Sequence, residues 1–164
     1  MEVQSPFQIA IFLYPGVTVL DAAGPFEVLS HMPATEVRFV AKETGPITTE
    51  GGILLLGATH TMAETTSPDL VIVPGGTTTP GQMVDDEVLE WLRNVHETSV
   101  LDHIYLHWFS HPGCCRHFER HACYDALDQK SVLKTMGSKP QPDERIVRCG
   151  KIVTGVSAGT DLGL

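Results

Sequence analysis

The strongest constraint on the fold is the run from Asp69 to Gly76, in which four apolar residues, mostly β-branched, are closed by Pro-Gly-Gly. A short apolar run that ends this way is typical of a strand buried on both faces of a parallel sheet. Gly75 and Gly76 have no Cβ, so a ligand can approach their amides, and open α/β sheets place their sites at the carboxyl ends of strands. The alternative is that Pro-Gly-Gly only ends the strand.

Length and charge narrow the class of protein. A chain of 164 residues suits one domain, so we expect residues 1–164 to form a single unit. The net charge of −9 argues against a nucleic-acid partner. No apolar run is long enough for a membrane span, and the first residues lack a signal-peptide pattern, so we expect a cytoplasmic protein. The four cysteines are not spaced as a disulfide framework, which also favours a reducing compartment.

Hydrophobic periodicity predicts alternating strands and helices. Strands are expected at 7–13, 36–41 and 70–73, helices at 25–32 and 85–96, hairpins at 47–56 and 145–154, and a helix start at 157–161. Pro25 is expected in the first turn of its helix. This alternation predicts an α/β sandwich around a mainly parallel sheet.

Residues 101–128 differ from the rest of the chain. Five of the eight histidines and three of the four cysteines lie there, where a further strand and a small-residue turn into a helix are expected. The family resemblance described next also stops after Val100 and resumes near Ser131.

Four segments carry a resemblance to a known family: Phe12–Pro25, Asp69–Gly76, Glu144–Arg148 and Gly155–Asp161. In order and spacing they resemble the ThiJ/PfpI superfamily, which has the class I glutamine amidotransferase-like fold, and most of all its isonitrile hydratase branch. The resemblance covers residues 7–100 and 131–164. It implies a flavodoxin-like α/β sandwich, a homodimer and a small-molecule substrate, with no cofactor and no metal.

The resemblance also implies residue roles in hydrating an isonitrile to an N-substituted formamide. Asp21 matches the acid/base partner, and Gly75, Gly76 and Thr77 match the loop that faces the nucleophile and binds substrate. The family cysteine follows Thr-Ser-Val, so its position here holds Leu101. Because leucine is neither nucleophilic nor ionisable, we expect the printed chain to be inactive. The alternative for Asp21 is a helix cap.

Three interpretations of residues 101–128 remain open. Two compensating frame shifts in a former enzyme would replace the family sequence abruptly at both ends. A metal site is the second, because His103, His107 and His111 recur at a four-residue spacing beside cysteines, although Pro112 would break a helix through them. In the third, the segment is ordinary structure in which residues 104–109 complete a strand.

Two expectations concern the whole protein. The family normally continues with a long helix after Leu164, so we expect a C-terminally truncated member. The rival functions are a non-catalytic ligand-sensing domain, as in related transcription regulators, and a glyoxalase-like enzyme.

Overall fold

The computed structural model describes residues 5–82, 84–105, 122–123, 139–140 and 146–155. Its helices are α1 (Val19–Leu29), α2 (Thr79–Gln82) and α3 (Asp86–Thr98). Its strands are β1 (Phe7–Phe12), β2 (Thr35–Ala41), β3 (Gly45–Thr48), β4 (Leu55–Ala58), β5 (His60–Thr61), β6 (Leu70–Val73), β7 (Leu101–Tyr105), β8 (Ala122–Cys123), β9 (Lys139–Pro140), β10 (Ile146–Cys149) and β11 (Ile152–Gly155).

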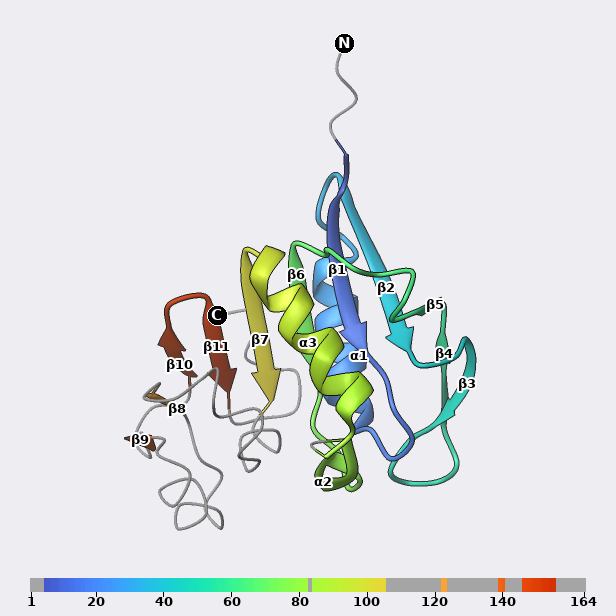
Figure 1. Ribbon diagram of the computed structural model, residues 1–164. Helices are drawn as coiled ribbons and strands as arrows, with labels where there is room; N and C mark the ends of the chain where they lie inside the picture. Colours follow the sequence, from blue (N-terminus) through green and yellow to red (C-terminus); the bar gives the residue numbers. More distant parts are fainter. Residues whose placement is uncertain (1–4, 83, 106–121, 124–138, 141–145, 156–164) are drawn as a thin grey trace.

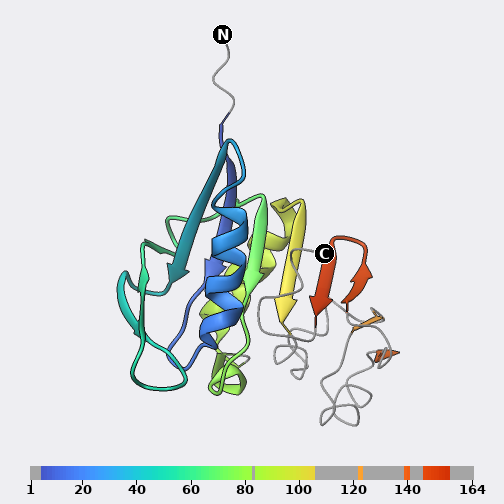
Figure 2. The ribbon, with the colours of Figure 1, turned by 180° about the vertical axis from the view of Figure 1, so that it is seen from behind.

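Seven strands form the central sheet in the order β10-β11-β7-β6-β1-β2-β5. Every neighbouring pair in it is parallel except β10 and β11. Helix α3 covers one face of the sheet (Figure 1) and α1 covers the other (Figure 2). The order β2-β1-β6-β7-β11 is that of the flavodoxin-like fold, which confirms the predicted α/β sandwich with a mainly parallel sheet.

The core lies along β1 and β6. All four residues of β6 are buried, as are the last four of β1, because both strands carry continuous apolar sequence and have a helix on each side. The predicted strand before Pro-Gly-Gly is therefore confirmed. Its carboxyl end lies beside the carboxyl end of β1, since Ile11 pairs with Ile72 in parallel register.

The predicted hairpins are confirmed, and the first helix is corrected. Strands β3 and β4 pair antiparallel, as do β10 and β11, whose turn lies at Gly150 and Lys151. Helix α1 begins at Val19, six residues before the predicted start, and so contains Pro25 in its interior. Its early turns are held by burial of Ala22 and by the hydrogen bond from the Gly75 amide to Asp21, and these tertiary contacts outweigh the unfavourable proline.

The unusual segment begins as a strand of the central sheet. In β7, Leu101 to Ile104 pair with Leu70 to Val73 of β6. The third interpretation expected a strand at 104–109, and β7 overlaps this range at residues 104 and 105. His103 therefore lies in a strand and not in a helix, as the metal-site interpretation needed, whereas His107 and His111 lie outside the described residues. Residues 106–121 and 124–138 and the expected helix start at 157–161 lie outside the described residues.

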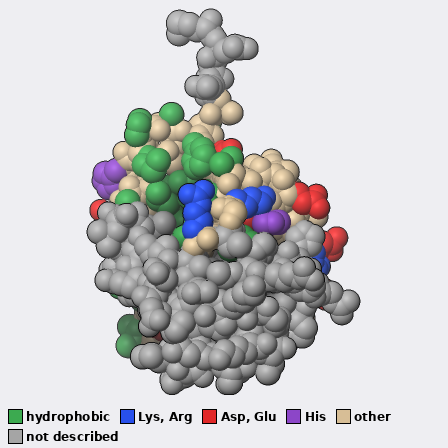
Figure 3. Space-filling model, turned by 90° about the vertical axis from the view of Figure 1, so that its left-hand side faces the viewer, with side chains coloured by type: hydrophobic (Ala, Val, Ile, Leu, Met, Phe, Trp, Pro, Cys, Tyr) green, Lys and Arg blue, Asp and Glu red, His purple; other side chains and the backbone are tan. Residues whose placement is uncertain are grey.

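Seen from the side of β10, the described surface carries hydrophobic side chains beside Lys and Arg side chains (Figure 3). No helix in the described part of the chain is long and apolar enough to cross a membrane.

Candidate active site

Asp21 lies in the first turn of α1 and points to the end of β6. Its Oδ2 accepts a hydrogen bond of 3.0 Å from the backbone amide of Gly75. The residue that precedes the helix is Thr18, and no side-chain cap bond forms there. Asp21 is therefore not the N-cap of α1. It is a near-cap residue in the first turn, and its carboxylate makes a contact across the fold.

The environment of Asp21 favours its protonated form. The side chain is buried, and burial raises its pKa from 3.8 to about 6, with a smaller increase from the negative charge of Glu50. The hydrogen bond from Gly75 opposes this increase. The other carboxylate oxygen, Oδ1, is buried and has no hydrogen-bond partner among the described residues. Asp21 therefore has an oxygen that can exchange a proton near neutral pH.

The chain around Pro74, Gly75 and Gly76 is held against the loop after β1. The Thr18 amide donates to the Gly75 carbonyl at 2.8 Å, and the Thr77 amide donates to the Gly16 carbonyl at 3.0 Å. A Cβ on Gly76 would lie 2.3 Å from the Gly16 carbonyl oxygen, so only glycine fits there. The resemblance assigned Gly76 to the substrate loop. The close packing against Gly16 is a second reason, a structural one, why this position requires glycine.

The backbone amides of the three predicted loop residues differ in whether they already donate a hydrogen bond. The amide of Gly75 is used by Asp21, and the amide of Thr77 is used by Gly16. In the part of the chain that the structure describes, the Gly76 amide has no hydrogen-bond acceptor. Gly76 is thus the amide in this loop that is most available to a bound molecule.

The structure does not bring Leu101 to this site. Leu101 pairs with Leu70 at the start of β6, whereas Gly75 and Gly76 follow the end of the same strand. Since strands rise about 3.3 Å per residue, the two ends of β6 are separated by roughly 10 Å. Asp21, Gly75 and Gly76 come together at the carboxyl end of the sheet, and Leu101 lies at the opposite end. The residues that follow Tyr105 in the sequence lie outside the described part.

Tyr14 was not singled out in the sequence. Its side chain is 2 % exposed, and its hydroxyl lies 2.8 Å from the Pro74 carbonyl and 2.8 Å from Thr79 Oγ1. The Thr79 hydroxyl in turn donates to the Gly76 carbonyl at 2.7 Å. The only sequence signal for this role is that Tyr14 closes the continuous buried run that begins in β1, and that pattern cannot reveal a partner 60 residues away.

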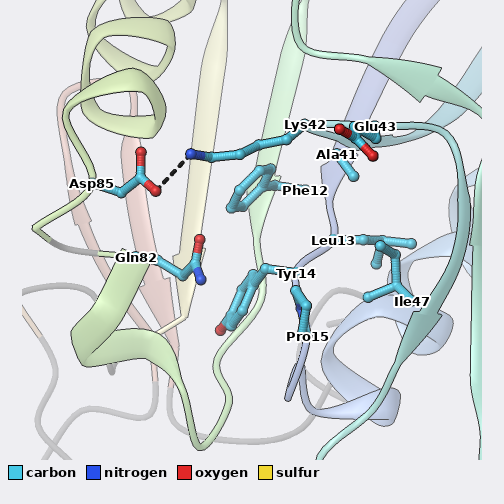
Figure 4. A pocket seen from close by; sticks show the side chains of 10 residues that line it. All are labelled: Phe12, Leu13, Tyr14, Pro15, Ala41, Lys42, Glu43, Ile47, Gln82 and Asp85. Carbon is cyan, nitrogen blue, oxygen red and sulfur yellow. Dashed lines mark hydrogen bonds and ion pairs between the residues drawn. The ribbon is translucent and has the colours of Figure 1, made fainter.

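A pocket of about 340 Å³ lies on the α3 side of the sheet at the carboxyl ends of β1 and β2 (Figure 4). Lys42 crosses its mouth and pairs with Asp85 at 2.6 Å and with Glu87 at 2.9 Å. These carboxylates neutralise the lysine, so the pocket offers no unpaired cation from this side chain. It is lined by Phe12, Leu13, Tyr14, Pro15, Ala41, Lys42, Glu43, Ile47, Gln82 and Asp85.

A second polar cluster lies at the start of β7. The buried carboxylate of Asp102 accepts a hydrogen bond of 2.5 Å from the Ser99 hydroxyl and pairs with Nδ1 of His96. In a hydrolytic triad the histidine stands between serine and aspartate, whereas here the aspartate stands between the other two. The serine is therefore not activated by the histidine, and the cluster fastens the end of α3 to β7.

A metal site is not evident. Among the described residues, no group of three or more His, Cys, Asp or Glu side chains is arranged to hold a metal ion. The cysteines that adjoin the histidines in sequence, Cys114 and Cys115, lie outside those residues.

Comparisons with known proteins identify the family of the chain. Residues 7–101 match the DJ-1/PfpI family. The chain is 32% identical over 164 residues to the isonitrile hydratase of Pseudomonas putida, covering 96% of this chain and 69% of that enzyme. A ThiJ/PfpI family protein from Pseudomonas syringae superposes with a TM-score of 0.85 at 23% identity, covering 96% of this chain and 66% of that protein. DJ-1beta of Drosophila melanogaster gives a TM-score of 0.80 at 15% identity, covering 94% and 84%.

Proposed function

Because the chain belongs to the DJ-1/PfpI family, in the branch that contains isonitrile hydratase, we propose that its site is built to hydrate a small isonitrile to an N-substituted formamide. The observation that carries the proposal is the buried carboxyl of Asp21, bonded to the Gly75 amide with its second oxygen unpartnered among the described residues. Family membership supports the reaction class, and the geometry supports the roles below.

The chemistry adds one water molecule to the terminal carbon of the isonitrile, with no change in the other bonds of the substituent. The carbon must be protonated and attacked by a nucleophile. A carboxyl with a pKa of about 6 is protonated in a fraction of the molecules at neutral pH, so it can donate a proton to the isonitrile carbon. It recovers the proton from the water molecule that is added. In this proposal Asp21 is the acid/base partner, the Gly76 amide stabilises developing negative charge, and Thr77 contributes to substrate binding.

The nucleophile of this reaction has no candidate among the described residues that the resemblance matched. The sequence match puts Leu101 in place of the family cysteine, so in this proposal the printed chain does not turn over. The geometry also predicts the outcome of restoring a cysteine at this position, because Leu101 lies at the end of β7 that is far from Asp21. We expect Leu101→Cys to give no activity, since its sulfur would stand near Leu70 and not beside the carboxyl.

The deciding experiment compares three proteins in an assay with cyclohexyl isocyanide and, separately, methylglyoxal. The first is the printed chain, the second a chain whose codons 98–131 are restored to the family frame, and the third the restored chain with Asp21→Asn. Formamide production by the second alone supports the proposal. Formamide production by the unrestored chain would reject the proposal, as would equal rates of formamide production by the restored chain and its Asp21→Asn variant. Consumption of methylglyoxal alone would favour a glyoxalase-like enzyme.

The pocket beside Tyr14 favours a second candidate, a non-catalytic ligand-sensing domain. It is lined by two aromatic rings and a neutralised lysine, a surface suited to a small uncharged organic molecule. This candidate predicts no turnover by the restored chain. It also predicts an increase in Tm with ligand that Gln82→Leu, at the wall of the pocket, reduces.

We also propose a cytoplasmic homodimer that does not bind nucleic acid. The net charge of −9 disfavours nucleic acid. Large apolar side chains are exposed after β3 and on α1, with exposed fractions of 94% for Ile53, 49% for Leu54 and 47% for Leu20. Covering such side chains is a common reason for association. Light scattering should give twice the chain mass, and Ile53→Glu should shift the protein toward monomer.

A further inference from the structure

The two residues that commonly cap a helix have other partners at the start of α1. Thr18 is the N-cap and Asp21 the third helical residue, the pair that in many helices satisfies the first free amides. Here the Thr18 amide donates to the Gly75 carbonyl at 2.8 Å, and Asp21 accepts from the Gly75 amide at 3.0 Å. The Thr18 hydroxyl makes no cap bond, so it is available to a different group.

That group is the carboxylate of Glu50, in the loop after β3. Its Oε2 accepts from the Thr18 hydroxyl at 2.9 Å, and the Glu50 amide donates to the Val17 carbonyl at 3.1 Å. The preceding residue, Thr49, is buried and pairs with Val17 in a parallel bridge, which fixes the backbone on which Glu50 stands. Because residues three apart at the start of a helix have Cβ atoms about 5–6 Å apart, a carboxylate held by Thr18 lies close to Asp21.

We propose that Glu50 is a positioning residue for the proton of Asp21: held by Thr18, its negative charge keeps the buried acid in the protonated form. The charge of Glu50 and the burial of Asp21 act in the same direction, because both raise the pKa of the Asp21 carboxyl. The value of this effect for catalysis rests on the proposed function. The hold of Thr18 on Glu50 and the action of Glu50 on Asp21 do not.

The other titratable groups on the described elements around Asp21 are engaged elsewhere or distant from it. These groups are Tyr14 in the loop after β1, Glu27 on α1, and Glu36 and Arg38 on β2. The Tyr14 hydroxyl is bonded to the Pro74 carbonyl, and Glu27 is exposed six residues after Asp21. Glu36 and Arg38 pair with each other at 2.7 Å. Among these side chains, Glu50 is the one whose charge acts on the pKa of Asp21.

Glu50→Gln tests the proposal because glutamine can still accept from the Thr18 hydroxyl but carries no charge. The readout is the pKa of Asp21, followed by carboxyl ¹³C chemical shifts across a pH titration of the full chain. Removing a negative charge favours the ionised form, so this pKa should fall from about 6 by about 0.3 to 1. Glu27→Gln, the matched control on the same helix, should change it by less than about 0.2.

Salt and Thr18 provide two further readouts that simple packing would not change. Since Glu50 is exposed, salt screens its charge, so raising the ionic strength from about 0.02 M to about 1 M should lower the Asp21 pKa more in the unchanged chain than in Glu50→Gln. Thr18→Val removes the hydroxyl and should cause part of the fall seen in Glu50→Gln, whereas Thr18→Ser should restore the original value. An Asp21 pKa that is unchanged in Glu50→Gln or in Thr18→Val would overturn the proposal.

The titration also separates this inference from the proposed function. It needs no turnover, so a failure of the isonitrile assay leaves it intact. In the chain restored to the family frame, Glu50→Gln should move the high-pH limb of formamide production to lower pH by the same amount as the pKa. A lower Asp21 pKa without this displacement would support the action of Glu50 and reject Asp21 as the proton donor of the proposed reaction.

Discussion

Asp21 and Gly75 are 54 residues apart in sequence, and the carboxylate of the first accepts a 3.0 Å hydrogen bond from the amide of the second. This contact joins the first turn of α1 to the loop after β6. The contact gives the buried carboxyl of Asp21 one fixed hydrogen-bond donor, while burial disfavours its ionised form. The same residue that supports the proposed chemistry is therefore a cost to stability at neutral pH.

Asp21→Asn should stabilise the protein in a pH-dependent way. Raising the pKa from 3.8 to about 6 costs the ionised form about 3 kcal/mol. A raised folded-state pKa means that the folded protein binds more protons, so the contribution of Asp21 to stability is fully present below pH 3.8 and lost as the pH rises through about 6. The advantage of asparagine in the free energy of unfolding should therefore grow by about 2 kcal/mol between pH 4.5 and pH 8.

Urea unfolding at the two pH values measures this effect. Glu90→Gln is the matched control, because it neutralises an exposed carboxylate of α3. The difference between the two variants then isolates the effect of burial at Asp21 from the removal of a charge. An advantage of Asp21→Asn that is equal at pH 4.5 and pH 8 would contradict the assigned environment of the acid.

Gly76→Ala should prevent close packing of the two loops. The added Cβ would lie 2.3 Å from the Gly16 carbonyl oxygen and 2.9 Å from Val17 Cα, and both are backbone atoms, which cannot turn away as the end of a flexible side chain can. We expect a loss of at least about 3 kcal/mol in the free energy of unfolding. Gly57→Ala in β4, where a Cβ meets nothing within 4 Å, should change it by less than about 1 kcal/mol. Similar Tm values for the two variants would refute this account.

The strands and α3 could be predicted because their signals are local. Four successive apolar residues closed by Pro-Gly-Gly leave few alternatives to a buried strand, and the spacing of Val88, Leu89 and Val95 defines the buried side of α3. The start of α1 could not be predicted in this way. Pro25 is a local signal for a helix start, but the helix begins earlier because Asp21 and Ala22 are held by residues distant in sequence.

The candidate site could be predicted only where family residues were recognisable. Asp21 and the two glycines matched the family, and the structure brings them together. The nucleophile position was assigned from Thr98, Ser99 and Val100, a match too short to fix its place along a strand. In the structure these residues lie at the end of α3 and before β7. Tyr14 could not be found, because its contact depends on how two strands are aligned.

Asp85→Ala should cost about 1 kcal/mol through loss of a helix cap. Asp85 precedes α3 and accepts from the Val88 amide at 3.3 Å. Asp85→Ser keeps an oxygen in this position and removes the ion pair with Lys42, which is half-exposed and contributes little. Circular dichroism melts should therefore show a lower Tm for alanine than for serine. If serine is as unfavourable as alanine, the ion pair and not the cap is the stabilising contact.

Asp102→Ala should destabilise the protein because it removes a buried carboxylate with two side-chain partners. The carboxylate is buried, accepts from Ser99 at 2.5 Å and pairs with His96, while its own amide donates to the Lys151 carbonyl at 2.8 Å. Removing the side chain leaves the buried Ser99 hydroxyl and the His96 ring without this acceptor, so we expect a loss of about 2 to 4 kcal/mol in the free energy of unfolding. Glu97→Ala, an exposed change in the same helix turn as His96, is the control and should cost less than about 0.5 kcal/mol.

Hydrogen exchange gives a second measurement. Because the cluster fastens α3 to β7, the amides in the last turn of α3 should lose protection in Asp102→Ala, whereas those of β1 and β2 should keep theirs until global unfolding. Uniform loss of protection across the sheet would show that the cluster does not act at this junction alone.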